Sequence, residues 1–150
     1  MVLTCESEGV LVGSTEVEKT STNEEALLNK ARLARQNAHA PFSKFAVGAA
    51  LETEDGKIFT GCNIENVTLG LTMCAERVAL FKAISEGSKR FTRIAIVTDG
   101  DVPTPPCGAC RQLLWEFGGD LRVISENLRG QRVQHQLKQL LPLPFDARQL

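Results

Sequence analysis

Three cysteines in this chain have a spacing that could bind a metal ion. Cys107 and Cys110 form a Cys-x-x-Cys pair in the run PPCGACRQ, and Cys74 begins the run CAERVALF. Two thiolates separated by two residues can bind one zinc ion, each at about 2.3 Å. A single Cys-x-x-Cys pair is also typical of a redox dithiol or of half a zinc ribbon. Cys74 is therefore the residue that favours a three-cysteine zinc site.

Each of these thiols is expected at the start of a helix. Helix N-termini carry partial positive charge and unpaired N–H groups, so thiols placed there ionise more easily. Three thiolates leave one position of a tetrahedral zinc open, as in catalytic sites, and a water there can lose a proton near neutral pH. Because three thiolates make the site negative overall, a compensating positive charge is expected from Arg77 or from Arg111.

Glu76 follows Cys74 by two residues. On a regular helix, residues two apart point about 200° away from each other, so the two can share a site only if Cys74 lies in an irregular first turn. In that position Glu76 would act as a proton shuttle, a role that typically contributes about 10²- to 10⁴-fold in rate. The alternative is a glutamate that only interacts favourably with the helix dipole.

The elements that would position these residues alternate between helices and strands. Turn, capping and periodicity signals predict helices over residues 22–40, 74–87, 107–119 and 133–142, a β-hairpin over 46–64, and strands over 91–98 and 121–126. The first helix would begin at Thr22, which has capping-box spacing to Glu25, and the Asp55-Gly56 pair would form the hairpin turn. This order predicts an α/β fold, a mixed sheet covered by helices.

Length and charge narrow the class of protein. The 150 residues suit one domain, which we expect over residues 23–150 after a flexible N-terminal extension over residues 1–22. With 17 Lys and Arg against 18 Asp and Glu, the net charge of −1 does not favour nucleic acid as a partner. The sequence has no apolar run that predicts a membrane span and no signal peptide, so we expect a cytoplasmic protein.

The two remaining cysteines have simpler interpretations. Cys62 is expected as a small buried hydrophobe in the second hairpin strand, and Cys5 as a free thiol in the N-terminal extension. An odd number of cysteines, three of them clustered, favours a metal site in a reducing compartment over a disulfide framework.

The motifs resemble those of a known family. Cys-x-Glu at one helix start and Pro-Cys-x-x-Cys at the next are similar to the zinc nucleobase deaminases. Within them, the runs GCNIEN, CAER, PCGACRQ and LLP followed by Phe145 resemble the homotetrameric cytidine deaminases, over residues 24–145. The resemblance implies a three-layer α/β/α fold with a five-stranded mixed sheet, and one zinc ion per subunit held by Cys74, Cys107 and Cys110.

The resemblance also implies a reaction and a set of substrate contacts. Zinc-bound hydroxide would attack C4 of cytidine or deoxycytidine, and Glu76 would carry the proton to N3 and then to the departing amino group, as in pyrimidine salvage. Arg77 would hydrogen-bond the zinc thiolates. The residues that would contact the substrate are Phe45 beside the base, Asn63 and Glu65 at the ribose hydroxyls, the backbone of Ala75 at the pyrimidine carbonyl, and Phe145 from a neighbouring subunit.

Three other functions remain open. Cys62 could complete a closed four-cysteine shell, which would make the chain a structural zinc module. An editor of RNA or DNA cytosines would share the metal site, although the charge balance speaks against it. A deaminase of a nucleoside antibiotic such as blasticidin S is the third, but Arg77 in CAER favours cytidine. Leu69 and Met73 depart from the family pattern and leave fine substrate preference open.

Overall fold

The fold is built on one five-stranded sheet. The computed structural model describes residues 14–150, with side chains from residue 23 onward except that of residue 148. The strands are β1 (Val47–Thr53), β2 (Ile58–Cys62), β3 (Phe91–Thr98), β4 (Arg122–Asn127) and β5 (Arg132–Gln136). Their order in the sheet is β2-β1-β3-β4-β5, and only the β3–β4 pair is parallel. The expected five-stranded mixed sheet is confirmed.

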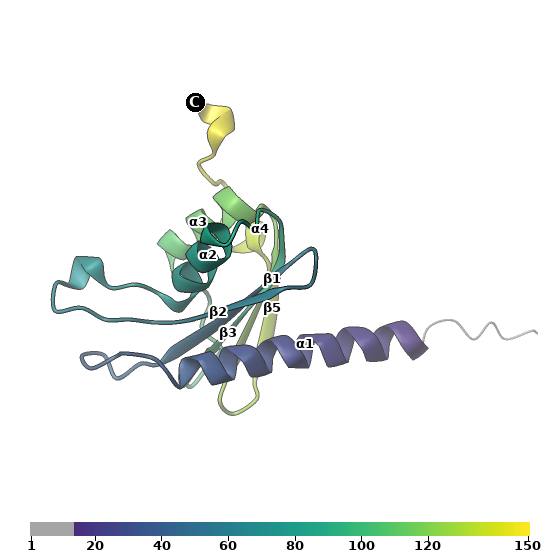
Figure 1. Cartoon of the computed structure of the whole chain (residues 1–150), viewed down its shortest axis with the longest axis horizontal. Helices are drawn as coiled ribbons and strands as arrows, with labels where there is room; N and C mark the ends of the chain where they lie inside the picture. Colours follow the sequence, from purple (N-terminus) through teal and green to yellow (C-terminus); the bar gives the residue numbers. More distant parts are fainter. Residues whose placement is uncertain (1–13) are drawn as a thin grey trace, which may run out of the picture.

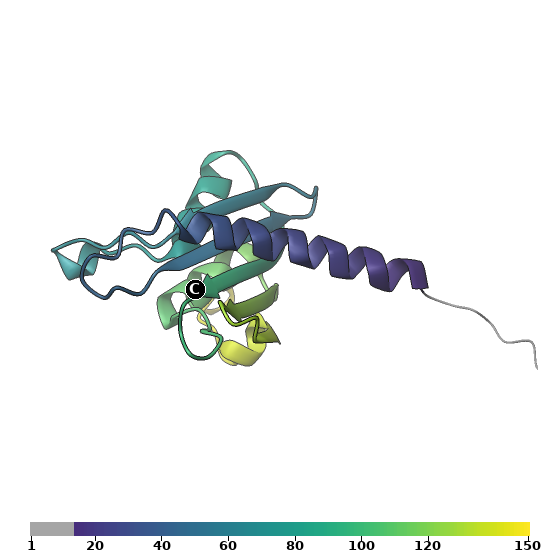
Figure 2. The same ribbon diagram turned by 90° about the horizontal axis from the view of Figure 1, so that it is seen from below.

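Helices cover both faces of this sheet. They are α1 (Ser14–Arg35), α2 (Ala75–Ser85), α3 (Gly108–Gly118) and α4 (Leu137–Leu140), with short 3-10 turns η1 (Leu69–Leu71) and η2 (Ala147–Gln149). Helix α1 lies on one face, and α2, α3 and α4 lie on the other, which confirms the three-layer α/β/α arrangement (Figure 1). The N-terminal part of α1 extends past the sheet (Figure 2). Among residues 14–150, no helix is long and apolar enough to cross a membrane.

Strand β3 joins the two halves of the core. Successive side chains of a strand point to opposite faces, so Ile94 and Ile96 pack in the cluster with α2 and α3, whereas Ala95 and Val97 pack in the cluster with α1. All four side chains are at most 2% exposed. Burial on both faces explains why residues 94–97 of β3 are all apolar, without alternation.

The β1–β2 hairpin turns where Asp55-Gly56 predicts it. Gly56 has φ +80°, a conformation that favours glycine, and its N–H donates to the carbonyl of Thr53 at 3.0 Å. The N–H of Thr53 donates to the carbonyl of Lys57 at 3.0 Å and closes the turn.

The start of α1 differs from the sequence prediction. The helix begins at Ser14 rather than at Thr22, so Thr22 lies inside it and its capping-box spacing does not mark a helix start. Residues 14–40 contain no glycine or proline, and nothing in that segment breaks the helix. A division of the chain at residue 22 stays a prediction, and Cys5 lies outside the described residues.

The helix predicted over residues 133–142 is wrong in its first half. Arg132–Gln136 forms strand β5, antiparallel to β4, and only Leu137–Leu140 is helical. The cause is a tight turn after β4, in which Gly130 has φ +79° and the side-chain Oδ1 of Asn127 accepts hydrogen bonds from the N–H groups of Arg129 and Gln131. This turn brings β5 back onto the sheet.

Candidate active site

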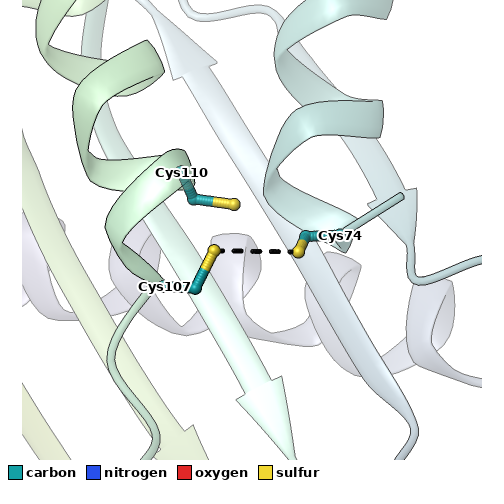
Figure 3. Close-up of side chains that lie close together, drawn as sticks. All are labelled: Cys74, Cys107 and Cys110. Carbon is teal, nitrogen blue, oxygen red and sulfur yellow. Dashed lines mark hydrogen bonds between the residues drawn. The ribbon is translucent and has the colours of Figure 1, made fainter. Parts of the chain in front are cut away.

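Two helix starts bring the three predicted thiols together. Cys74 is the N-cap residue of α2 and Cys107 that of α3, both with extended backbone, while Cys110 lies in the first turn of α3. The three sulfur atoms lie within 4.8 Å of one another, and those of Cys74 and Cys107 are 3.9 Å apart (Figure 3). The expected non-helical position of Cys74 is confirmed, so Cys74 and Glu76 can face one site.

Close packing fixes the position of both helix starts. A Cβ atom on Gly61 of β2 would lie 2.4 Å from the carbonyl oxygen of Ala75, so only glycine lets α2 approach the sheet this closely. At the start of α3, Arg111 donates to the carbonyl oxygens of Pro106 at 2.7 Å and Leu140 at 2.9 Å. Arg111 therefore supports the backbone here, and no hydrogen bond joins it to a described thiol.

Arg77 supplies the positive charge beside the thiols. Its Nη2 donates to the sulfur of Cys74 at 3.4 Å and to the carbonyl oxygen of Thr72 at 3.0 Å. A hydrogen bond with Cys110, together with Arg77, lowers the pKa of Cys74 to about 5, whereas the same hydrogen bond and burial raise the pKa of Cys110. The thiolate of Cys74 in turn raises the pKa of Arg77.

The donor set fits a zinc ion. Two Zn–S bonds of about 2.3 Å at a tetrahedral angle place the sulfurs about 3.8 Å apart, close to the 3.9 Å between Cys74 and Cys107. A divalent cation also deprotonates its thiol ligands, so all three cysteines could ionise together around it. No fourth His, Cys, Asp or Glu of the described residues joins the group, so these side chains would supply three ligands to an ion.

Cys62 does not belong to this group. Its thiol donates to the carbonyl oxygen of Asn37 at 3.3 Å, away from the other three sulfurs. It is also partly exposed, so the expectation of a small buried hydrophobe is wrong, because Cys62 lies on the face of β2 that it shares with the partly exposed Ile58 and Thr60. A closed four-cysteine shell completed by Cys62 is not supported.

Glu76 is the buried carboxyl group of the site. Its side chain is only 5% exposed, although a glutamate in the first turn of a surface helix is usually solvated. Burial, with a further contribution from the negative charge of Cys74, raises the pKa of Glu76 to about 7. A carboxyl group with this pKa can both accept and donate a proton near neutral pH.

A cavity of about 240 Å³ opens beside the thiols. Seven site residues predicted from the sequence line it: Phe45, Asn63, Glu65, Cys74, Ala75, Glu76 and Cys107. Met73 also lines it, whereas Leu69 is 72% exposed on η1 and is not part of this lining. The residues expected around the substrate are thus brought together within one subunit, with the exception of Phe145.

Asn63 shapes the wall of this cavity. Its Oδ1 accepts a hydrogen bond from the N–H of Val47 at 2.9 Å, and its Nδ2 donates to the carbonyl oxygen of Phe45 at 2.8 Å. The amide therefore fixes the backbone at the start of β1. One N–H of its NH₂ group remains free to bind another partner.

Glu65 holds the loop that carries Phe45. Its carboxylate accepts hydrogen bonds from the backbone N–H groups of Phe42 at 2.8 Å and Ser43 at 3.2 Å. Hydrogen bonds from Ser43, followed by the one from Phe42, keep the pKa of Glu65 below its ordinary value. A carboxylate has about four acceptor positions, so this anion can still bind a hydroxyl.

Phe145 lies outside the cavity of its own chain. Its side chain is 59% exposed, and its carbonyl oxygen accepts a hydrogen bond from Nε2 of Gln112 at 2.6 Å. The C-terminal segment projects away from the body of the molecule (Figure 1). A role of Phe145 in substrate binding would therefore require a second subunit.

Several cavity-lining residues were not predicted from the sequence. They come from the start of β1 and the loop before it, from the segment between η1 and α2, from β3 and from the loop before α3. They are Ser43, Val47, Thr72, Ile96, Thr98, Thr104 and Pro105. The lining residues of β3 could have been predicted from the sequence. Side chains of a strand alternate between its faces, so Thr98 lies on the same face as Ile94 and Ile96.

Comparison with known proteins identifies the family. A family model for the cytidine and deoxycytidylate deaminase zinc-binding region matches residues 21–126. This chain belongs to that deaminase family. The three thiols and Glu76 all lie within the matched region of the deaminase, and the expected class of zinc-dependent hydrolase is confirmed.

Relatives of this deaminase match over most of its length. The cytidine deaminase of Sporosarcina psychrophila is 46% identical over 127 residues, which cover 84% of this chain and 93% of the relative. A crystal structure of cytidine deaminase from Burkholderia pseudomallei has a TM-score of 0.79 and 47% identity, and covers 81% of this chain and 98% of that one. The blasticidin-S deaminase of Bacillus cereus is more distant, at 33% over 111 residues, or 69% of this chain and 79% of that one.

Proposed function

We propose that this chain hydrolyses free cytidine and deoxycytidine to uridine and deoxyuridine with release of ammonia. The observation that carries the proposal is the buried carboxyl group of Glu76, which lines the same cavity as Cys74 and Cys107. Family membership and the cytidine deaminases among the relatives support this substrate class. The reaction would serve pyrimidine salvage.

The proposed chemistry assigns one task to each polar group. Cys74, Cys107 and Cys110 would hold zinc, which supplies the Lewis acidity that makes a water molecule more acidic. Glu76 would accept one proton from water and deliver it to N3 of the pyrimidine, and would then move the second water proton, from the hydroxyl added at C4, to the departing amino group. Arg77 would keep Cys74 in the thiolate form through its hydrogen bond.

The other cavity residues would hold the nucleoside. Phe45 would lie against the base, and the backbone of Ala75 would contact the pyrimidine carbonyl. Asn63 and Glu65 would bind the ribose hydroxyls with the hydrogen-bonding capacity that their backbone contacts leave free. All four line the cavity, which supports this assignment.

An ultraviolet assay tests the substrate class. We expect purified protein to convert cytidine and deoxycytidine to the uracil nucleosides and to lose this activity after incubation with a zinc chelator. Adenosine, cytidine monophosphate and blasticidin S should stay unchanged in the same assay. Turnover of blasticidin S without cytidine, or of cytosine in a single-stranded oligonucleotide at physiological salt, would contradict the proposal.

We propose further that the active protein is a homotetramer whose active sites are shared between subunits. Support comes from the exposed ring of Phe145 and from other large apolar side chains left exposed near the cavity loops. These are Phe42, Ile64, Val67, Leu69 and Leu71, each at least 46% exposed. Contact with other subunits would cover such a surface.

Replacing Phe145 with alanine tests the shared site. We expect KM for cytidine to rise about tenfold, because stacking a base on an aromatic ring contributes about 1–3 kcal/mol. Leu143→Ala is the matched control, since Leu143 is 93% exposed in the same segment and has no proposed contact with substrate. Unfolding and refolding the Phe145→Ala chain together with a Glu76→Gln chain should restore activity, because mixed tetramers contain sites with both residues. No restoration would contradict sharing.

The proposed location is the cytoplasm. Three thiols within 4.8 Å of one another must stay reduced to bind a metal ion. Reducing compartments keep thiols in that state, and the proposed salvage reaction takes place on free nucleosides there.

A further inference from the structure

The segment over residues 99–106 leads into Cys107, one of the three thiols of the site. Its backbone makes few hydrogen bonds. Pro103, Pro105 and Pro106 have no N–H to donate. Among the described residues, no backbone-to-backbone hydrogen bond involves residues 99–106. Side chains must therefore fix the position of this segment.

Two core residues anchor the first part of this segment, and Arg111 of α3 holds its last residue through the carbonyl oxygen of Pro106 at 2.7 Å. The hydroxyl groups of Thr98 and Thr104 are 3.2 Å apart, and Thr98, at the end of β3, is 1% exposed. The Nδ2 of Asn127, which is 0% exposed at the end of β4, donates to the carbonyl oxygen of Asp101 at 3.0 Å. Both anchors belong to the central parallel strand pair, so the segment is tied to the most buried part of the sheet.

A stiff link connects Thr104 to Cys107. Only Pro105 and Pro106 lie between them, and each ring fixes φ of its own residue near −65°. The residue before a proline is also restricted to extended backbone, which applies to Thr104 and to Pro105. A displacement of Thr104 would therefore be transmitted to Cys107 rather than absorbed between them.

Cys107 is the thiol that most needs such support. It is exposed, whereas Cys110 is buried within the first turn of α3. As an N-cap residue it lies outside the regular helix, and its side chain makes no capping hydrogen bond. Its carbonyl oxygen accepts a hydrogen bond from the N–H of Arg111 at 2.9 Å, so α3 fixes one side of its backbone and the preceding segment fixes the other.

We propose that the hydroxyl pair of Thr98 and Thr104 is a latch that sets the position of Cys107 and thereby slows the loss of the metal ion. The two threonines are positioning residues, and the inference rests on the proposed function because it takes the three thiols as the metal ligands. Hydrogen bonds that orient metal ligands typically change metal affinity by about 10- to 100-fold.

Zinc release measures the effect of the latch directly. The zinc-loaded protein is mixed with an excess of a chromophoric chelator, and the rate of zinc transfer is followed. Thr104→Val removes the hydroxyl and keeps the shape, and we expect release to become about tenfold faster. Thr104→Ser keeps the hydroxyl and should release zinc at nearly the parent rate. Thr92→Val, at the opposite end of β3, is the matched control and should match the parent.

Two further measurements separate the latch from a general loss of stability. In cobalt-substituted protein, the sulfur-to-cobalt absorption bands should shift in Thr104→Val and in Thr98→Val but not in Thr92→Val. If the hydroxyls act as one unit, the double variant should release zinc no faster than either single variant.

The outcomes distinguish the latch from the function. Unchanged zinc release and unchanged cobalt bands in Thr104→Val, in a protein that does bind zinc, would overturn the latch alone. Release from Thr104→Ser as fast as from Thr104→Val, or additive effects in the double variant, would also overturn it. A parent protein that binds no zinc would overturn the proposed function and the latch with it.

Discussion

Glu76→Gln is expected to lower kcat for cytidine by about 10²- to 10⁴-fold while the protein keeps its zinc. Glutamine has nearly the same shape as glutamate but cannot take a proton from water or give one to the pyrimidine. The side chain of Glu76 is 5% exposed and lines the cavity, so solvent is poorly placed to replace it as the proton carrier. Steady-state kinetics and zinc analysis of the same preparation check both parts.

Glu86→Gln is the control for this substitution. Glu86 is exposed at the C-terminal end of the same helix, α2, and should tolerate the change without loss of activity or zinc. If Glu76→Gln kept the parent kcat, the carboxyl group would have no part in proton transfer. The glutamate would then only interact favourably with the helix dipole or stabilise the fold.

The Cys110→Ser variant is expected to lose most of its bound zinc and essentially all turnover of cytidine. Apparent zinc binding energies in protein sites are about 10–16 kcal/mol, so one thiolate contributes about 3 kcal/mol, and its loss weakens binding at least about 10²-fold. Cys110 is 0% exposed, so no water can easily take its place as a ligand. Zinc content after dialysis and cytidine turnover are the measurements.

Cys62→Ser is the matched control. Its thiol bonds to the carbonyl oxygen of Asn37 rather than to the three-thiol group, so both zinc and activity should persist. Loss of zinc from Cys62→Ser, with a Glu76→Gln variant that does not differ from the parent, would instead identify a structural four-cysteine site.

The sequence was informative wherever chemistry depends on neighbours along the chain. Cys74 and Cys107 could be placed at helix starts because loop and helix signals meet at those residues, and Cys110 follows from its spacing. The spacing alone left both Arg77 and Arg111 open, and only the family resemblance favoured Arg77. Arg77 lies three residues after Cys74, on the same helix face, whereas Arg111 lies one residue after Cys110 and points elsewhere.

Features that depend on distant residues were less predictable. Strand β5 exists because the turn around Asn127 returns the chain to β4, and its mostly polar side chains show no apolar alternation. The Thr98–Thr104 contact joins a strand to an irregular loop, and no spacing rule links the two hydroxyls. Whether Phe145 reaches another subunit depends on how the subunits assemble. The residues around Phe145 in the sequence do not indicate that arrangement.

The close pair of Cys74 and Cys107 has a practical consequence for handling the metal-free protein. With a pKa of about 5, Cys74 is a thiolate at neutral pH, and the thiolate is the form that oxygen and peroxides oxidise. Its sulfur is 3.9 Å from that of the exposed Cys107, which offers a ready partner for a disulfide. Metal exchange therefore needs anaerobic buffer and a reductant, since oxidised material would mimic a protein that never bound metal.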